Sequence, residues 1–266
     1  MSLSRREVLL LAAGAVGSLA DAAARRAWGA PPGLPPGHHL VLRVPALTAN
    51  GARVPIVVEM DHPMEPDHHI TRVDVVNERD PVPSKGAYHL TPASGRVHLA
   101  FQARLDEGES TLVATAECSR HGRCVAARTV RIAAGGGGCT GAAAAPGAPD
   151  PDEIRPPVLR IPQLVAHGRI RPDQVLTVQV KTRHPVRTGL QVRDGKFVQA
   201  SDPFYLAELE AFHGGERVSR FVLTAALSDN PLITFALRAR REGPLTVVLT
   251  NSRGQRFHAT HPLRFG

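Results

Sequence analysis

The stretch VLRVPALTANG at residues 41–51 returns as VLRIPQLVAHG at residues 158–168, with the shared pattern V-L-R-[VI]-P-x-L-x-A-x-G. Each copy is followed by a run rich in β-branched residues and then by a His-Pro pair. These features lie at 54–59 and 62–63 after the first copy, and at 175–180 and 184–185 after the second. Agreement across three successive elements indicates an internal repeat. The chain therefore reads as two related modules.

Both modules consist of short strand-like segments that are separated by turn residues at short intervals. The candidate strands are 39–44, 54–60, 70–77, 96–104, 110–118 and 124–132, then 158–161, 174–181, 204–213, 216–224, 232–240, 244–250 and 255–262. This spacing, in modules of about 100 residues, is typical of immunoglobulin-like sandwiches. We predict an all-β chain with two immunoglobulin-like β-sandwich domains, residues 31–132 and 158–266. A Gly-rich arm and linker at 133–157 joins them.

Residues 1–30 have the features of an export signal. The adjacent Arg5 and Arg6 precede an apolar run at 8–20, and residues 22–24 offer an A-x-A cleavage site. The apolar run is shorter than a membrane span of about 20 residues. This order is typical of a twin-arginine signal peptide, with an ordinary N-terminal helix as the alternative. We therefore expect a periplasmic protein, exported by the twin-arginine pathway and free of the membrane after signal cleavage.

The charge and the motifs exclude several classes of protein. The formal net charge is +8, but the basic residues are scattered and only 4% of residues are aromatic. Nucleic-acid binding is therefore not expected, whereas an anionic ligand or an acidic partner is compatible with the charge. The sequence also lacks G-x-S-x-G, H-E-x-x-H and a phosphate-binding loop. We expect no enzyme activity.

One cysteine lies on a ribbon of glycines, in AAGGGGCTG at residues 133–141. Polyglycine has nothing to pack and stays mobile, so the sequence predicts that Cys139 is exposed. With no Arg or Lys beside it, its pKa is expected near the ordinary thiol value of about 8.5. An extended arm from Ala133 would reach roughly 20 Å, far enough to enter sites on other proteins. An incidental linker cysteine is the alternative.

The other two cysteines, Cys118 and Cys124, flank the segment SRHGR at 119–123, which has the composition of a hairpin tip. In an oxidising compartment a disulfide between them is the main expectation. Its short loop would make it only modestly stabilising. Free thiols are the alternative, and a redox-active pair lacks the C-x-x-C spacing.

A histidine-rich loop, MDHPMEPDHH, spans residues 60–69. Its Met, His and carboxylate side chains are ligands that copper or zinc accepts, but their spacing fits no fixed metal motif. His62 also has an equivalent in the second module, His184, which favours a role in forming a turn. We therefore expect a solvated loop and no resident metal, with His62, His68 and His69 as weak candidate ligands.

Together, the export signal, the two sandwich modules and the cysteine on a glycine arm resemble the SoxY–SoxZ sulfur carrier of bacterial thiosulfate oxidation, fused in one chain. The first module resembles SoxY because its last predicted strand runs directly into the glycines and Cys139. The second resembles SoxZ through RIP at 160–162, HPVRTG at 184–189 and SDNPLITF at 228–235. The resemblance covers about residues 38–266.

The resemblance implies a non-catalytic periplasmic carrier that holds sulfur intermediates covalently on Cys139. The implied swinging arm consists of Gly135, Gly136, Gly137, Gly138 and Gly141. In the family, a haem c enzyme joins thiosulfate to the thiol and a hydrolase releases sulfate, so no cofactor other than the bound sulfur intermediate is expected. Family arms usually end the chain as Gly-Gly-Cys-Gly-Gly. Here Thr140 follows the cysteine and the chain continues, so this arm would enter a partner as a loop.

Two alternatives remain at this stage. Fused SoxYZ-like carriers are also associated with quinoprotein dehydrogenase systems, in which the cargo differs. A non-catalytic periplasmic metal-binding or assembly module would instead depend on the histidine-rich loop. In the carrier interpretation, we expect the two modules to pair within the chain, by strand pairing or by a face-to-face contact between sheets.

Overall fold

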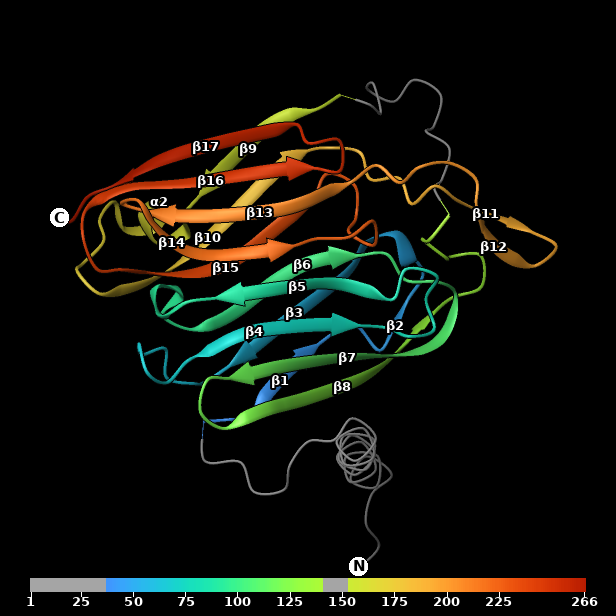
Figure 1. Cartoon of the computed structure of the whole chain (residues 1–266), viewed down its shortest axis with the longest axis horizontal. Coiled ribbons are helices and arrows are strands. Elements are labelled where there is room, and N and C mark those ends of the chain that lie inside the picture. Colours follow the sequence, from blue (N-terminus) through green and yellow to red (C-terminus); the bar gives the residue numbers. More distant parts are fainter. Residues whose placement is uncertain (1–36, 141–152) are drawn as a thin grey trace, which may run out of the picture.

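The computed structural model describes residues 37–140 and 153–266 (Figure 1). The first module contains β1 (Leu40–Arg43), β2 (Leu47–Thr48), β3 (Val54–Met60), β4 (Ile70–Val76), β5 (Ser84–Leu90), β6 (Val97–Ala103), β7 (Gly108–Cys118) and β8 (Gly122–Ile132), with the 3-10 turns η1 (Gly51–Arg53) and η2 (Pro92–Ser94). The second contains β9 (Arg155–Arg160), helix α2 (Pro162–His167), β10 (Gln174–Arg183), β11 (Leu190–Arg193), β12 (Lys196–Gln199), β13 (Leu206–His213), β14 (Glu216–Val222), β15 (Leu232–Ala239), β16 (Gly243–Asn251) and β17 (Arg256–Leu263).

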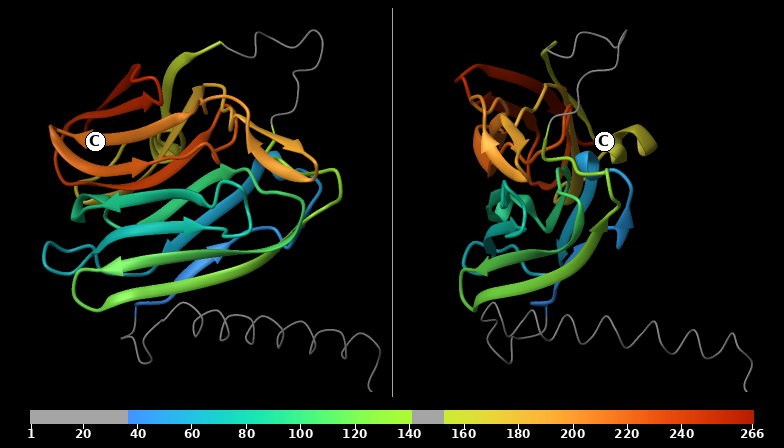
Figure 2. Two further views of the ribbon diagram at one scale, coloured as in Figure 1. Left: turned by 45° about the vertical axis from the view of Figure 1, so that its right-hand side comes forward. Right: turned by 90° about the vertical axis from the view of Figure 1, so that its right-hand side faces the viewer.

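The strands form two large sheets that face each other (Figure 2). One sheet has six strands in the order β1-β3-β6-β15-β10-β9, and the other has nine in the order β17-β16-β13-β14-β5-β4-β7-β8-β2. Strands β11 and β12 form a separate hairpin. Each module thus contributes one part of both layers, and the prediction of an all-β chain with two sandwich domains is confirmed.

Alternating side chains explain why these segments become strands with one buried face. Along β3 and β6, every second residue is buried, which is the period of a pleated strand. Four strands, β2, β5, β11 and β12, are absent from the sequence-based prediction. The missed β5 lies in the centre of the larger sheet, between β4 and β14.

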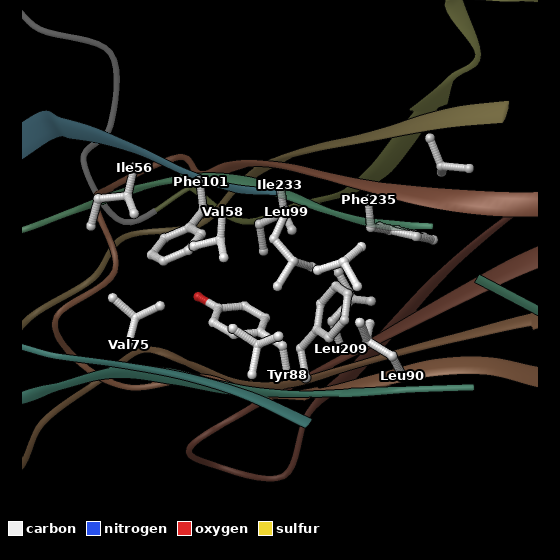
Figure 3. Packing of buried hydrophobic residues seen from close by; sticks show 14 of the residues in the cluster. Ile56, Val58, Val75, Tyr88, Leu90, Leu99, Phe101, Leu209, Ile233 and Phe235 are labelled. Atoms are coloured by element: carbon white, nitrogen blue, oxygen red, sulfur yellow. The ribbon is translucent and has the colours of Figure 1, made fainter. Parts of the chain in front are cut away.

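The two modules join edge to edge in both layers. Strand β5 pairs with β14 in one sheet, and β6 pairs with β15 in the other. Between these pairs, the rings of Tyr88 and Phe221 lie 5.1 Å apart, and Tyr88 also lies 5.1 Å from Phe101. Figure 3 shows Tyr88 and Phe101 next to each other in this shared core, with Phe235 farther along it. The expected pairing of the modules by strands is confirmed.

The repeat is visible as a common local structure at the two His-Pro pairs. His62 Nδ1 lies 2.5 Å from the carbonyl oxygen of Pro63, and His184 Nδ1 lies 2.6 Å from that of Pro185. The repeats diverge after the shared proline, where the first copy forms β2 and η1 and the second forms α2. The modules therefore share their framework strands and differ in the connection that follows β1 or β9.

Several predicted features lie outside the described residues: the export signal at 1–30, Gly141 and much of the linker. Strand β9 begins at Arg155, inside the predicted linker. Of the helices in the described ranges, none is both long and apolar enough to cross a membrane.

Candidate carrier-thiol site

Cys139 follows β8 on an arm that lies against the protein instead of extending into solvent. The cysteine is only 1% exposed. The prediction of an exposed thiol on a mobile arm is therefore wrong for this structure. The physical reason is that the glycines have a docking surface, which is built by segments near residues 51 and 105 of the same module.

Backbone hydrogen bonds hold the arm in place. The Gly51 amide donates to the carbonyl oxygen of Gly136 at 2.6 Å, and the Gly138 amide donates to that of Leu105 at 2.9 Å. The Gly135 amide donates to the Glu107 carboxylate at 2.8 Å. The arm thus uses its peptide groups as a strand would, which offsets part of the entropy that polyglycine loses on ordering.

Two glycines of the arm are required for this close approach. A Cβ atom on Gly138 would lie 2.3 Å from the backbone of Gly51, and one on Gly136 would lie 2.4 Å from the carbonyl oxygen of Ala49. Gly135 is different, because its Cβ would meet nothing within 4 Å and its φ of 74° is what favours glycine there. The glycines therefore act as a flat docking face as well as a source of flexibility.

The second module closes over the arm. Arg104, from the first module, donates to the carbonyl oxygens of Gly138 at 2.8 Å and Val186 at 3.1 Å, and it pairs with Asp229 at 2.6 Å. The Thr188 hydroxyl donates to the carbonyl oxygen of Cys139 at 2.7 Å. Val186, Thr188 and Asp229 belong to the HPVRTG and SDNPLITF segments, so these segments meet the arm directly.

A buried ion pair stabilises the segment on which the arm lies. Lys85 Nζ lies 2.6 Å from Asp80, with side-chain exposures of 0% and 2%. Lys85 also donates to the carbonyl oxygen of Arg104 at 3.0 Å, and Asp80 accepts from the Asp106 amide at 2.9 Å. The pair therefore fixes the segment 104–106, on which the arm lies.

Burial raises the pKa of Cys139 to about 12, with further contributions from the charges of Asp80 and Asp106 that outweigh the opposing effects of Lys85 and Arg104. The docked thiol is therefore protonated at neutral pH and a poor nucleophile, because the thiolate is the reactive form. The expectation of an ordinary pKa is wrong in the docked state.

The raised pKa predicts an unusual pH dependence of thiol alkylation. A free thiol reaches a plateau in alkylation rate above its pKa of about 8.5, whereas the rate for Cys139 should keep rising about tenfold per pH unit up to about pH 10. The free energy that favours the docked arm is fully present below about pH 8.5. It decreases as the pH rises toward about 12, because the docked site disfavours the thiolate. Stopped-flow alkylation between pH 7 and 10, beside a small-molecule thiol, measures this. A plateau near pH 8.5 would contradict a docked thiol.

Cys118 and Cys124 are both free thiols in the structure, so the predicted disulfide is wrong. The β7–β8 register places Cys118 opposite Gly122 and Cys124 opposite Ala116, so the two cysteines are diagonal neighbours and not a facing pair. Burial raises the pKa of Cys124 to about 11. Cys124 is therefore an inert core thiol, whereas Cys118 lies at the end of β7 beside His121.

The histidine-rich loop is not a simple solvated loop. His62 is buried, with its ring 4.5 Å from that of His38 and 4.6 Å from that of His68. His68 itself lies in a group of possible metal ligands with His38, His121 and Cys118. His69 is not part of this group, because its ring faces the carbonyl oxygen of Glu65. His38, His121 and Cys118 were missed as partners. The C-x-x-H spacing of Cys118 and His121 was the available signal.

Two family models match this chain in tandem. The model described as "Sulfur oxidation protein SoxY" matches residues 25–139, and the model described as "Sulphur oxidation protein SoxZ" matches residues 166–262. The chain is a fused SoxYZ protein. The SoxY match ends on Cys139, and the SoxZ match includes the residues of the second module that contact the arm. The recognition made from the Gly-Gly-Cys arm is thus confirmed at the level of family.

A search of curated proteins found no significant match for the fused SoxYZ protein. Among solved structures, superoxide reductase (neelaredoxin) from Ignicoccus hospitalis is 21% identical with a TM-score of 0.33, covering 36% of this chain and 81% of that one. Superoxide reductase from Nanoarchaeum equitans is 23% identical with a TM-score of 0.29, covering 37% and 96%. Murine CEACAM1b is 11% identical with a TM-score of 0.24, covering 85% and 99%.

Proposed function

We propose that this fused SoxYZ protein is a periplasmic, non-catalytic carrier that holds sulfur intermediates covalently on Cys139. A carrier role in sulfur oxidation follows from the two families. The observation that supports Cys139 as the attachment point is its position on a side-chain-free arm, held by polar contacts that can be broken one by one. No other cysteine in the described ranges lies on such an arm.

Loading requires the arm to leave its docking surface. Once released, the Cys139 thiol loses its proton, and the resulting thiolate can form a bond to the outer sulfur of thiosulfate while two electrons pass to a haem c enzyme. Water then cleaves the bond between sulfur and the sulfonate group, which gives sulfate and a persulfide on the carrier. The protein itself contributes a polarisable nucleophile and its presentation.

The docked state has no room for this cargo. Cys139 is 1% exposed, and the neighbouring Gly138 already lies in tight contact with the Gly51 backbone. A loaded arm should therefore stay undocked, whereas an empty arm returns to its protected position. Such a cycle would shield the free thiol from mispairing in an oxidising compartment and display it only when a partner binds or cargo is attached.

Cys139→Ala is expected to abolish the sulfur adduct while the fold is retained. Because the thiol is buried, a serine hydroxyl would need a new hydrogen-bond partner, so alanine is the better variant. Its cost should be about 1 kcal/mol, which is typical of point substitutions. Intact mass after incubation with thiosulfate and the oxidising partner measures the adduct.

Cys124→Ala is the matched control, since it also removes a buried thiol but leaves the arm intact. It should load like the parent protein. Equal loading of the parent protein and Cys139→Ala would contradict the proposal. Loading by a quinoprotein dehydrogenase system would use the same thiol, and the mass of the adduct would then differ from that of a thiosulfonate or persulfide.

A further inference from the structure

Four imidazoles and one thiol converge at the end of the first module that lies far from the carrier thiol. His38 precedes β1, His62 and His68 lie in the loop after β3, and Cys118 and His121 lie where β7 turns into β8. The arm begins at the other end of β8 (Figure 1). Since β8 has 11 residues, it separates the two sites by roughly 35 Å. The cluster is thus independent of the carrier thiol.

The ring nitrogens are as close as the ligands of one ion. His62 Nε2 lies 3.1 Å from His38 Nε2, His38 Nε2 lies 3.0 Å from His121 Nδ1, and His121 Nδ1 lies 3.1 Å from His68 Nε2. The ring centroids of His62 and His68 lie 4.6 Å apart, so these two rings are neighbours as well. Three consecutive nitrogen–nitrogen separations of 3.0–3.1 Å match the edges of a square whose centre lies about 2.1–2.2 Å from each corner, close to the usual metal–imidazole distance of about 2.0–2.1 Å.

Hydrogen bonding among the rings does not explain this arrangement. His62 is held with its Nδ1 at the carbonyl oxygen of Pro63, so its Nε2 carries a lone pair into the cluster. His38 Nε2 and His121 Nδ1 each face two other ring nitrogens. A ring nitrogen has a single in-plane direction for a proton or a lone pair, so it serves one neighbour at a time. A cation at the shared centre satisfies all four nitrogens together.

Cys118 supplies a fifth donor. Its Sγ lies 3.6 Å from His121 Nδ1, and the ligand atoms of His38, His68, Cys118 and His121 all lie within 4.8 Å of one another. The backbone amides of Arg120 and His121 both point at this sulfur at 3.4 Å. Two amide donors stabilise negative charge on sulfur, which is the form that binds metal.

Contacts outside the cluster hold the two donor loops together. The Ser119 amide donates to the carbonyl oxygen of His69 at 2.9 Å, and Arg120 Nε donates to that of Asp67 at 2.9 Å. These bonds join the turn that carries Cys118 and His121 to the loop that carries His68. Such outer contacts orient the ligands of metal sites and are a common part of their design.

We propose that this cluster is an iron site, with His38, His62, His68 and His121 as nitrogen ligands and Cys118 as the thiolate ligand. Structural zinc sites take four ligands in a tetrahedron, and this site offers five donors. Four nitrogen donors and one thiolate are also the set that holds iron in thiolate-ligated haem, and imidazole itself suits iron. Five ligands leave a sixth position, and His68 and His121 are partly exposed. A small anion can therefore reach the iron.

Metal analysis of the full-length protein tests the proposal directly. Chelator-treated protein is incubated without oxygen with Fe(II), Zn(II) or Cu(I), desalted and analysed for bound metal. We expect one iron per chain. Oxidation of that iron by ferricyanide, which removes one electron, should produce a visible thiolate-to-Fe(III) charge-transfer band that shifts when azide is added.

Three variants separate the ligands from the fold. His121→Asn should lower iron affinity at least about tenfold, and Cys118→Ser should abolish the visible band. His69→Asn, which changes a neighbouring histidine outside the cluster, should behave like the parent protein. Chemical unfolding of the metal-free forms, with closely similar midpoints expected, shows that all three fold.

The metal-binding results decide both the identity of the metal and the identity of its ligands. Zinc or copper bound in place of iron would overturn the assignment of the metal. Iron bound by His121→Asn and Cys118→Ser with parental affinity and band would overturn the cluster as the site. Cys139→Ala should bind iron normally, so a failure of the carrier proposal leaves this test intact.

Discussion

Replacing Gly138 with alanine is expected to raise the alkylation rate of Cys139 by about 10²–10³-fold at pH 7.5. The new Cβ would lie 2.3 Å from the backbone of Gly51, which cannot move aside without breaking its own bonds to Gly136 and Leu105. The arm must therefore undock. Release returns the thiol from a pKa of about 12 to that of a free thiol, which increases the thiolate fraction about a thousandfold.

Gly135→Ala is the matched control for this experiment. Its φ of 74° disfavours alanine by about 1 kcal/mol, but its Cβ would meet no atom within 4 Å. Its alkylation rate should rise less than about tenfold, in line with that small energy. If Gly138→Ala reacted no faster than Gly135→Ala, the docked arm could not be what protects the thiol.

The largest loss of stability is expected for Lys85→Met. This change leaves Asp80 charged and buried without its partner, and breaking a buried pair from one side costs about 3–5 kcal/mol. The carbonyl oxygen of Arg104 also loses its donor. The free energy of unfolding, measured by urea denaturation, should fall by this amount, and Cys139 should become more reactive.

The double variant Asp80→Asn with Lys85→Met should recover part of the loss, because no unpaired charge remains. Arg123→Met is the surface comparison, since its pair with Glu117 has side-chain exposures of 59% and 40%. It should change the free energy of unfolding by less than about 1 kcal/mol. A Lys85→Met effect as small as that of Arg123→Met would show that the buried pair does not support the arm.

The framework strands were predictable because their side chains alternate, as in β3 and β6. Strand β5 was not, since Ser84, Lys85 and Gly86 lack an apolar alternation and Pro81 and Pro83 precede them. This segment is a strand because β4 and β14 pair with both of its edges. Its stability comes from tertiary partners, which a local pattern does not contain.

The glycines of the arm have two physical effects, and the sequence analysis considered only one of them. The absence of Cβ gives freedom to an isolated chain, but it also lets Gly136 and Gly138 approach other backbone closely. Which effect dominates depends on residues near 51 and 105, far away in the chain. The sequence therefore placed Cys139 on the glycine arm, while its burial depends on residues that the local pattern does not contain.

Only some residues of the histidine cluster could be identified from the sequence. His62 and His68 stood out in one loop, and Cys118 stood out with Cys124 as a flank of a hairpin tip, whereas His121 was not singled out. Nothing local joined the two groups, because the β4–β7 pairing brings them together by placing Ile70 opposite Cys118. His38, which is 83 residues from His121, completes the cluster only in the folded module.

The central claim is that Cys139 carries sulfur, and mass spectrometry of its peptide tests this most directly. The fused SoxYZ protein would be purified without reductant from its native host during growth on reduced sulfur, and again after incubation with thiosulfate and the oxidising partner. The account predicts a thiosulfonate or a persulfide on Cys139 and unmodified thiols at Cys118 and Cys124. Only unmodified thiol at Cys139 in both samples would contradict it.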